Sequence, residues 1–82
     1  METRIEVLHT PGCPHVDDAR SLLHSCLTEL RLEATVVDRE GDYPSPTILL
    51  NGVDVMGRSD LRGAMCRLDL PTRDHVLAAL TA

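Results

Sequence analysis

The chain has 82 residues, a net charge of −5 and a hydrophobic content of 43%, with Tyr43 as its only aromatic residue. This length allows one small domain, spanning residues 1–82, whose core is built almost entirely from aliphatic side chains. The negative charge disfavours nucleic acids and anionic membranes as partners, because both attract clusters of Lys and Arg. No apolar run approaches the ~18 residues of a membrane span, and no basic and apolar leader opens the chain, so we expect neither a span nor a signal peptide. Three cysteines are an odd and low count for a secreted disulfide scaffold, so we expect a reducing, cytoplasmic environment. We also expect a monomer.

Apolar spacing predicts a β-α-β unit in the first half of the chain. Residues Arg4 to His9 mix apolar and polar side chains in the manner of a half-buried strand. From Pro14 to Leu30 the apolar residues recur every three or four positions, which predicts a helix with one buried face. The β-branched run within Leu32 to Asp38 predicts a buried strand. A strand, a crossover helix and a strand form a right-handed parallel unit.

The second half of the chain predicts a hairpin and a terminal helix. Two apolar runs, Thr47 to Leu50 and Val53 to Met56, flank Asn51-Gly52, which is the strongest short signal for a hairpin turn. Thr72 is placed to cap a helix that continues to Leu80. The fold class is therefore α/β in the order β-α-β-β-β-α, with a mixed four-stranded sheet and two main helices.

The segment from Gly57 to Leu70 lacks a clear period. Long loops of this kind in compact domains tend to be functional or mobile. We expect a loop here, with one helical turn around Ser59 to Ala64.

The sequence TPGCPH, from Thr10 to His15, places a cysteine at the turn between the first strand and the first helix. Backbone N–H groups and the helix dipole favour a thiolate at such a position, and a protonated His15 would add positive charge. Asp17 and Asp18 act in the opposite direction, because nearby carboxylates disfavour a second negative charge. These residues favour Cys13 as a nucleophile over the alternative of a small residue chosen for a tight turn.

The segment CPHV, from Cys13 to Val16, resembles the Cys-x-x-Cys active site of thioredoxin-like oxidoreductases, with Val16 in place of the second cysteine. The resemblance implies a thioredoxin-like fold, in which Cys13 alone is the exposed nucleophile and Pro14 lies beside it. The segment SPT, Ser45-Pro46-Thr47, resembles the family's cis-proline segment. Pro46 is then expected to be cis, to lie beside the thiol and to present the backbone of this segment to a bound peptide or thiol.

The segment GRSDL, from Gly57 to Leu61, is similar to the glutathione-binding region of glutaredoxins. The similarity implies that Asp60 accepts the amino group of glutathione. Arg58 stands where that region has its second glycine, and no lysine precedes Cys13 as it does in glutaredoxins. The later part of the chain also resembles small bacterial thioredoxin-like proteins, some of which are labelled as related to organomercurial lyase.

Without a cysteine at Val16, reaction at Cys13 must stop at a mixed disulfide, recruit glutathione or use another thiol. Cys66 is the candidate for that thiol, because Arg67 puts a cation beside its sulfur; the alternative is a half-buried loop residue. Cys26 lies on the apolar face of the first helix, which predicts a core position. No cysteine or histidine pair has zinc spacing, so no metal site is expected, although two thiols that met would suit a soft ion.

These residues support three functions. The first is a monothiol oxidoreductase in which Cys13 attacks a protein or glutathione disulfide, His15 tunes the thiol, Pro46 shapes the pocket, and Cys66 or glutathione resolves the intermediate. No resident cofactor is expected, and glutathione is the one candidate co-reactant. The alternative is a non-catalytic thiol module that binds mercury, copper(I) or a protein partner. The third is a redox-silent domain used for protein contact.

Overall fold

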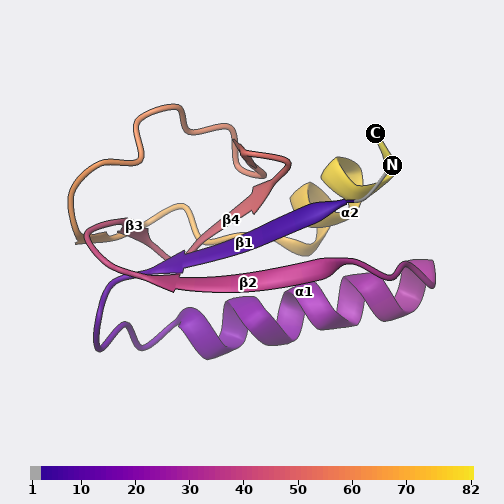
Figure 1. Cartoon of the computed structure of the whole chain (residues 1–82), viewed down its shortest axis with the longest axis horizontal. Coiled ribbons are helices and arrows are strands. Elements are labelled where there is room, and N and C mark those ends of the chain that lie inside the picture. Colours follow the sequence, from indigo (N-terminus) through magenta and orange to yellow (C-terminus); the bar gives the residue numbers. More distant parts are fainter. Residues whose placement is uncertain (1–2) are drawn as a thin grey trace.

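The computed structural model describes residues 3–82 and consists of a mixed four-stranded sheet with two helices, α1 (Val16–Leu30) and α2 (Arg73–Thr81) (Figure 1). In the sheet, β1 pairs in parallel with β2 and antiparallel with β4, which in turn pairs antiparallel with β5. The strand order is β2 (Thr35–Glu40), β1 (Arg4–His9), β4 (Thr47–Leu50) and β5 (Val53–Asp54). The α/β class, the mixed four-stranded sheet and the two helices predicted from the sequence are therefore confirmed.

Two short strands form a second, parallel sheet that the sequence does not predict. They are β3 (Pro44–Ser45) and β6 (Met65–Cys66). The expected helical turn around Ser59 to Ala64 is wrong, because residues 57–64 form no helix. Gly63 has a φ of +85°, which a right-handed helix does not allow, and the backbone N–H of Arg62 donates to the side chain of Asp60 instead of continuing a helix.

The helix and the second strand begin later than their apolar patterns predict. Helix α1 begins at Val16 rather than at Pro14, and His15 is its N-cap. Strand β2 covers Thr35–Glu40, and Val36 and Val37 within it are only half-buried. The prediction of a buried strand was wrong here because β2 is an edge strand, which has β1 as its only neighbour.

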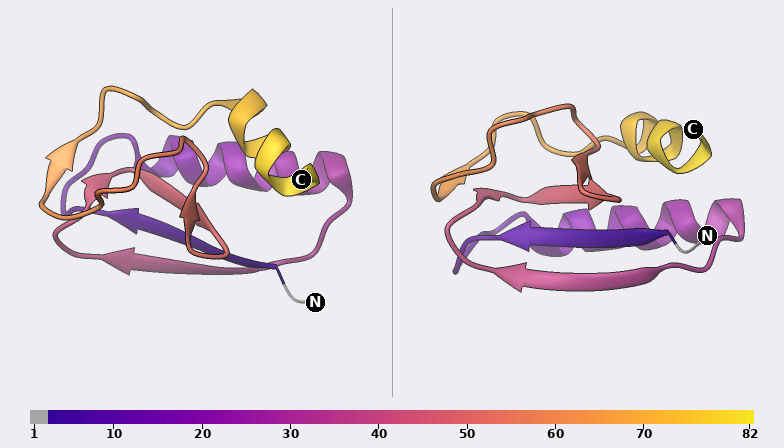
Figure 2. Two further views of the ribbon diagram at one scale, coloured as in Figure 1. Left: turned by 90° about the horizontal axis from the view of Figure 1, so that it is seen from above. Right: turned by 45° about the horizontal axis from the view of Figure 1, so that its top comes forward.

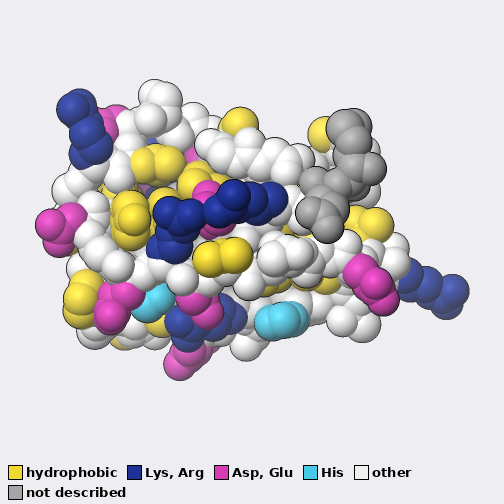
Figure 3. Space-filling view, in the orientation of Figure 1, with side chains coloured by type: hydrophobic (Ala, Val, Ile, Leu, Met, Phe, Trp, Pro, Cys, Tyr) yellow, Lys and Arg dark blue, Asp and Glu magenta, His cyan; other side chains and the backbone are white. Residues whose placement is uncertain are grey.

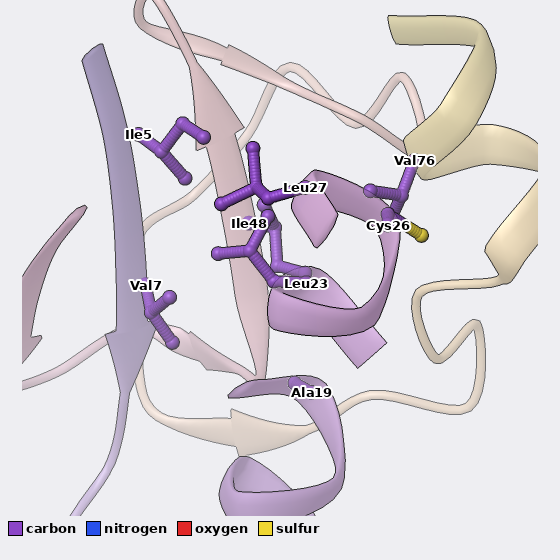
Figure 4. Close-up of a cluster of buried hydrophobic side chains, with 8 residues drawn as sticks. All are labelled: Ile5, Val7, Ala19, Leu23, Cys26, Leu27, Ile48 and Val76. Atoms are coloured by element: carbon purple, nitrogen blue, oxygen red, sulfur yellow. The ribbon is translucent and has the colours of Figure 1, made fainter. Parts of the chain in front are cut away.

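The hydrophobic core lies between the sheet and the two helices (Figure 4). Strands β1 and β4 contribute inward-pointing aliphatic side chains, α1 covers them, and Val76 of α2 lies beside Cys26 of α1. Cys26 is fully buried, as predicted. The buried members of this cluster are Ile5, Val7, Ala19, Leu23, Cys26, Leu27, Ile48 and Val76. Both helices therefore pack on the same face of the sheet.

The opposite face of the sheet carries no helix. Side chains alternate between the two faces along a strand, so Leu8, Thr47, Leu49 and Asp54 point away from the helices. All four are buried nevertheless. The cover comes from the segment between β5 and α2, whose Arg67 side chain bonds to Thr47 and to Asp54.

Local turn signals are confirmed in the second half of the chain. Asn51 and Gly52 have φ values of +50° and +85° in the turn between β4 and β5, as a two-residue hairpin loop requires. The Thr72 hydroxyl accepts a hydrogen bond of 3.2 Å from the backbone N–H of His75 and so caps α2. Helix α2 lies at the end of the molecule opposite to β6 and the β1–α1 turn in each view (Figures 1 and 2).

Candidate functional site

Cys13 lies in the turn that connects β1 to α1. Its backbone N–H donates to the carbonyl of Thr10 at 3.2 Å, and Gly12 before it has a φ of +76°, which favours glycine at this point of the turn. The Cys13 residue is 9% exposed. His15 follows as the N-cap of α1, makes no side-chain capping bond and is exposed. The exposed thiol implied by the resemblance is therefore wrong for this structure, because Cys13 is buried, whereas the imidazole two residues later is open to solvent.

A pocket of about 140 Å³ lies next to this turn. It brings His15 at the start of α1 together with Pro46, and the Ser45–Pro46 peptide bond is cis, the conformation implied by the resemblance to the cis-proline segment. The lining consists of His15, Asp18, Ala19, Leu22, Pro46, Leu70 and Pro71. Two segments that lie about 30 residues apart in the sequence thus share one concave surface beside Cys13.

Strand β3 lies between the Cys13 turn and Cys66. The antiparallel register pairs Leu8 with Thr47, and β3, which precedes Thr47, contacts β1. On its other side, Ser45 of β3 pairs with Cys66 of β6. Neighbouring strands are about 4.8 Å apart. Cys66 and the Cys13 turn therefore lie at the same end of the molecule (Figures 1 and 2), although neither Cys13 nor Cys66 lines the pocket and all three cysteines are free thiols.

The four residues expected to contact substrate differ in their surroundings. Pro46 lines the pocket, and Pro14 is exposed beside Cys13. Thr47 is buried, and its hydroxyl donates to the carbonyl of Pro44 at 2.6 Å, which ties it into the fold. Ser45 is also fully buried, and its Oγ has no hydrogen-bond partner among residues 3–82.

Arg67 is the residue whose importance the sequence does not reveal. It is 3% exposed, and its guanidinium donates to Asp54 at 2.9 Å, to Thr47 at 2.9 Å and to Asp69 at 3.1 and 2.6 Å. Its backbone N–H donates to the carbonyl of Ser45 at 2.9 Å. Burial alone would lower the pKa of Arg67, but the hydrogen bonds with Asp69 and Asp54 raise it above its usual value. We call these four side chains, Arg67, Asp54, Asp69 and Thr47, the Arg67 cluster.

The Arg67 cluster changes the interpretation of Cys66. The sequence suggests that Arg67 acts on the Cys66 sulfur, yet the guanidinium is bound by two carboxylates and a hydroxyl. The alternative of a half-buried loop residue was wrong as well, because Cys66 is exposed. What Arg67 does for Cys66 is to anchor the backbone that carries it, through the bond to Ser45.

Asp60 lies apart from the pocket beside Cys13. It accepts the backbone N–H of Arg62 at 3.2 Å and the Arg62 guanidinium at 3.3 Å. These bonds, the backbone bond first, hold the pKa of Asp60 below its usual value. Asp60 lines a separate shallow groove with Ser59, Leu61 and Arg62. The structure therefore does not bring the predicted glutathione contact into the pocket that His15 and Pro46 share.

Comparison of the chain with protein-family models, with curated proteins and with solved structures found no match. Within residues 3–82, no group of three or more His, Cys, Asp or Glu side chains is placed to hold a metal ion. No helix in the same range is both long enough and apolar enough to cross a membrane.

Proposed function

We propose that the chain is a thioredoxin-like monothiol protein that exchanges thiols and disulfides through Cys13. The observation that carries the proposal is the pocket between His15, two residues after Cys13, and the cis-proline Pro46. Cys13 lies just before a helix, and the pocket next to its turn has a second wall from another segment. Such a pocket is suited to hold a second sulfur compound within reach of the thiol. The order of β1, α1, β2, β4, β5 and α2 agrees with the thioredoxin-like arrangement implied by the resemblance.

The reaction conserves thiols and electrons at each step. The Cys13 thiolate attacks one sulfur of a substrate disulfide, a new S–S bond forms, and the other substrate sulfur leaves as a thiolate that takes up a proton. A second thiol, from Cys66 or from glutathione, then attacks the Cys13 sulfur of the mixed disulfide, and the remaining substrate sulfur leaves as a thiolate that takes up a proton. The substrate disulfide gains two electrons in total, and the two attacking thiols become a disulfide.

The roles of the neighbouring residues follow from their positions. His15 is exposed at the N-cap of α1, where its imidazole, when protonated, favours the Cys13 thiolate or hands a proton to the leaving sulfur. Pro46 forms the wall of the pocket opposite His15. Cys66 is exposed and tethered next to Ser45, so it is available to a mixed disulfide formed at this end of the molecule.

The proposal is tested by disulfide reduction with a glutathione-recycling system, using the wild-type chain and the variants Cys13→Ser, Cys66→Ser and Cys26→Ala. Cys13→Ser should lose turnover completely, while Cys26→Ala, a change in the core, should keep it. Turnover by Cys13→Ser equal to that of the wild type would contradict the proposal.

Intact-mass analysis after mild oxidation identifies the second thiol. A Cys13–Cys66 disulfide would assign that role to Cys66, and a glutathione adduct on Cys13 alone would assign it to glutathione. Stoichiometric uptake of mercury(II) or copper(I) by a chain that shows no turnover would favour the non-catalytic thiol module instead.

A further inference from the structure

The pocket beside Cys13 combines apolar walls with one carboxylate. Its apolar members come from α1, from Pro46 and from the segment that leads into α2. Its volume of about 140 Å³ is close to the ~150 Å³ of an apolar cavity that takes up benzene. One branched or aromatic side chain therefore fills it. Asp18 is the single carboxylate in the lining.

Asp18 differs from its neighbour Asp17 in being uncompensated. Asp17 accepts a hydrogen bond from Arg20 at 2.7 Å, and the same guanidinium donates to Asp38 at 3.1 Å. The hydrogen bond with Asp38 is the main reason why the pKa of Arg20 is raised above its usual value. Within residues 3–82, Asp18 has neither a hydrogen bond nor an ion pair, and no Lys or Arg lines the pocket.

More apolar surface lies around this end of the molecule (Figure 3). Leu70 lines the pocket and is 37% exposed, and Leu68, two residues earlier, is 99% exposed. Met65 in β6 is exposed as well. Leu70 therefore extends the apolar lining to the surface, and Leu68 and Met65 add exposed apolar side chains at this end of the molecule, which suits a polypeptide better than a small polar thiol.

We infer that the substrate of this site is a protein segment with an apolar side chain next to a Lys or Arg, rather than glutathione disulfide. The inference rests on the proposed function of Cys13. The apolar side chain fills the pocket, and the cation lies against Asp18 in a chain whose net charge is −5. Glutathione carries two carboxylates, and no Lys or Arg lines this pocket to receive them; His15 is the one basic side chain in the lining.

Binding without thiol chemistry tests the inference independently of turnover. The probe is a set of fluorescent eight-residue peptides without cysteine, which differ at two central positions: Leu-Lys, Leu-Glu and Ser-Lys. They are titrated against Cys13→Ser protein, so that no covalent adduct forms. We expect the Leu-Lys peptide to bind about tenfold more tightly than the Leu-Glu peptide at low salt, because attraction is exchanged for repulsion at Asp18.

Two charge variants locate the source of that preference. Asp18→Asn should reduce the preference for Leu-Lys over Leu-Glu by about threefold to fivefold. Glu33→Gln removes the same charge from an exposed position beyond the end of α1 and should leave the preference unchanged. Equal effects of both variants would show that net charge alone selects the ligand and would overturn the inference.

The same set of peptides separates a failure of peptide binding from a failure of the Cys13 chemistry. Equal binding of the Leu-Lys and Ser-Lys peptides would show that the pocket does not bind the apolar side chain and would overturn the inference, whatever the activity of Cys13. If wild-type protein reduces glutathione disulfide faster than a Leu-Lys peptide disulfide, the substrate class is wrong while the role of Cys13 stands. Charge-selective binding together with no reduction of any disulfide would contradict the proposed function and leave the docking site in place.

Discussion

The two faces of the sheet are stabilised in different ways. On one face, β1 and β4 meet two helices through aliphatic side chains and Cys26 (Figure 4). On the other face, a long irregular segment covers the sheet, and its main anchor is the buried guanidinium of Arg67. Apolar packing is non-directional and tolerates exchange of one aliphatic side chain for another. A buried ion cluster requires every partner, because a charge left alone in the interior is strongly destabilising.

The polar face also carries the part of the candidate site that contains Cys66 and the Ser45–Pro46 segment. Arg67 fixes the backbone next to Cys66 through its bond to Ser45, and Ser45 precedes Pro46 in the pocket wall. Loss of the Arg67 side chain would keep that backbone bond but would remove the guanidinium bond to Thr47, the residue after Pro46, and should therefore loosen this wall of the pocket. Loss of a core side chain would weaken the whole domain without acting on the site first.

The largest effect is expected from Arg67→Met. Removing the guanidinium leaves the buried Asp54 carboxylate without its ion-pair partner, although the backbone N–H groups of Met56 and Arg58 still donate to it, and should lower the free energy of unfolding by about 3–5 kcal/mol. Urea denaturation followed by circular dichroism measures the loss. Arg62→Met is the matched control, because the Arg62 side chain is 93% exposed and its ion pair with Asp60 contributes little.

A double variant keeps this test informative if the single variant does not fold. Arg67→Met with Asp54→Asn removes the unpaired charge as well and should be more stable than Arg67→Met alone. A double variant less stable than the single one would show that Asp54 has a role apart from its bond with Arg67.

The helix-covered face should respond somewhat less to a single change. Leu23→Ala removes a buried side chain of α1 that is 1% exposed and should cost about 3 kcal/mol through lost burial and a cavity. The urea midpoint should fall with little change in slope, since the domain still unfolds as one unit. Leu68→Ala, at a fully exposed position, should stay within about 0.5 kcal/mol of the wild type.

The contrast between the faces also explains what the sequence could predict. The spacing within α1, the Asn51-Gly52 turn and the Thr72 cap are local signals, and each predicted its element. Burial of Cys26 followed from the same helical period. The prediction that β2 is buried failed because the strand lies at the edge of the sheet, and no local sequence pattern shows the position of a strand within a sheet.

The polar face depends on contacts between residues that are far apart in the sequence. Arg67 lies 13 residues from Asp54 and 20 from Thr47, and the pairing of β3 with β6 joins two dipeptides. No periodicity marks such contacts.

For the site, the sequence proposed Cys13, His15 and Pro46, and the structure places the last two in one pocket. The position of Asp18 in its wall required the structure.

A local test of the helix-covered face gives a smaller effect. Thr72→Ala removes the cap of α2, the helix that brings Val76 into the core, and should cost about 1 kcal/mol. Thermal unfolding detects a change of this size in a small domain. Thr28→Ala at an exposed position inside α1 is the control and should be neutral or slightly stabilising. A neutral Thr72→Ala variant would show that the packing of Val76, Leu77 and Leu80 on the core holds α2 in place without the cap.

The smallest effect is a pH dependence on the polar face. The hydrogen bond from Arg67 holds the pKa of Asp69 below its usual value. A lowered pKa means that Asp69 stabilises the fold above its ordinary value of about 4, and that this contribution is lost as the pH falls through the lowered value. Because the Asp69 side chain is 48% exposed, the contribution at neutral pH should not exceed about 1 kcal/mol.

Asp69→Asn makes this contribution measurable. The variant should be less stable than the wild type at neutral pH, and the difference should shrink and vanish as the pH falls through the lowered pKa of Asp69. Asp42→Asn, at an exposed position, controls for the change in net charge. A difference that stays constant over this range would mean that Asp69 holds Arg67 through geometry rather than charge. The polar face would then resemble the apolar one in that its stability does not vary with pH, and Asp69 would hold Arg67 through hydrogen-bond geometry alone.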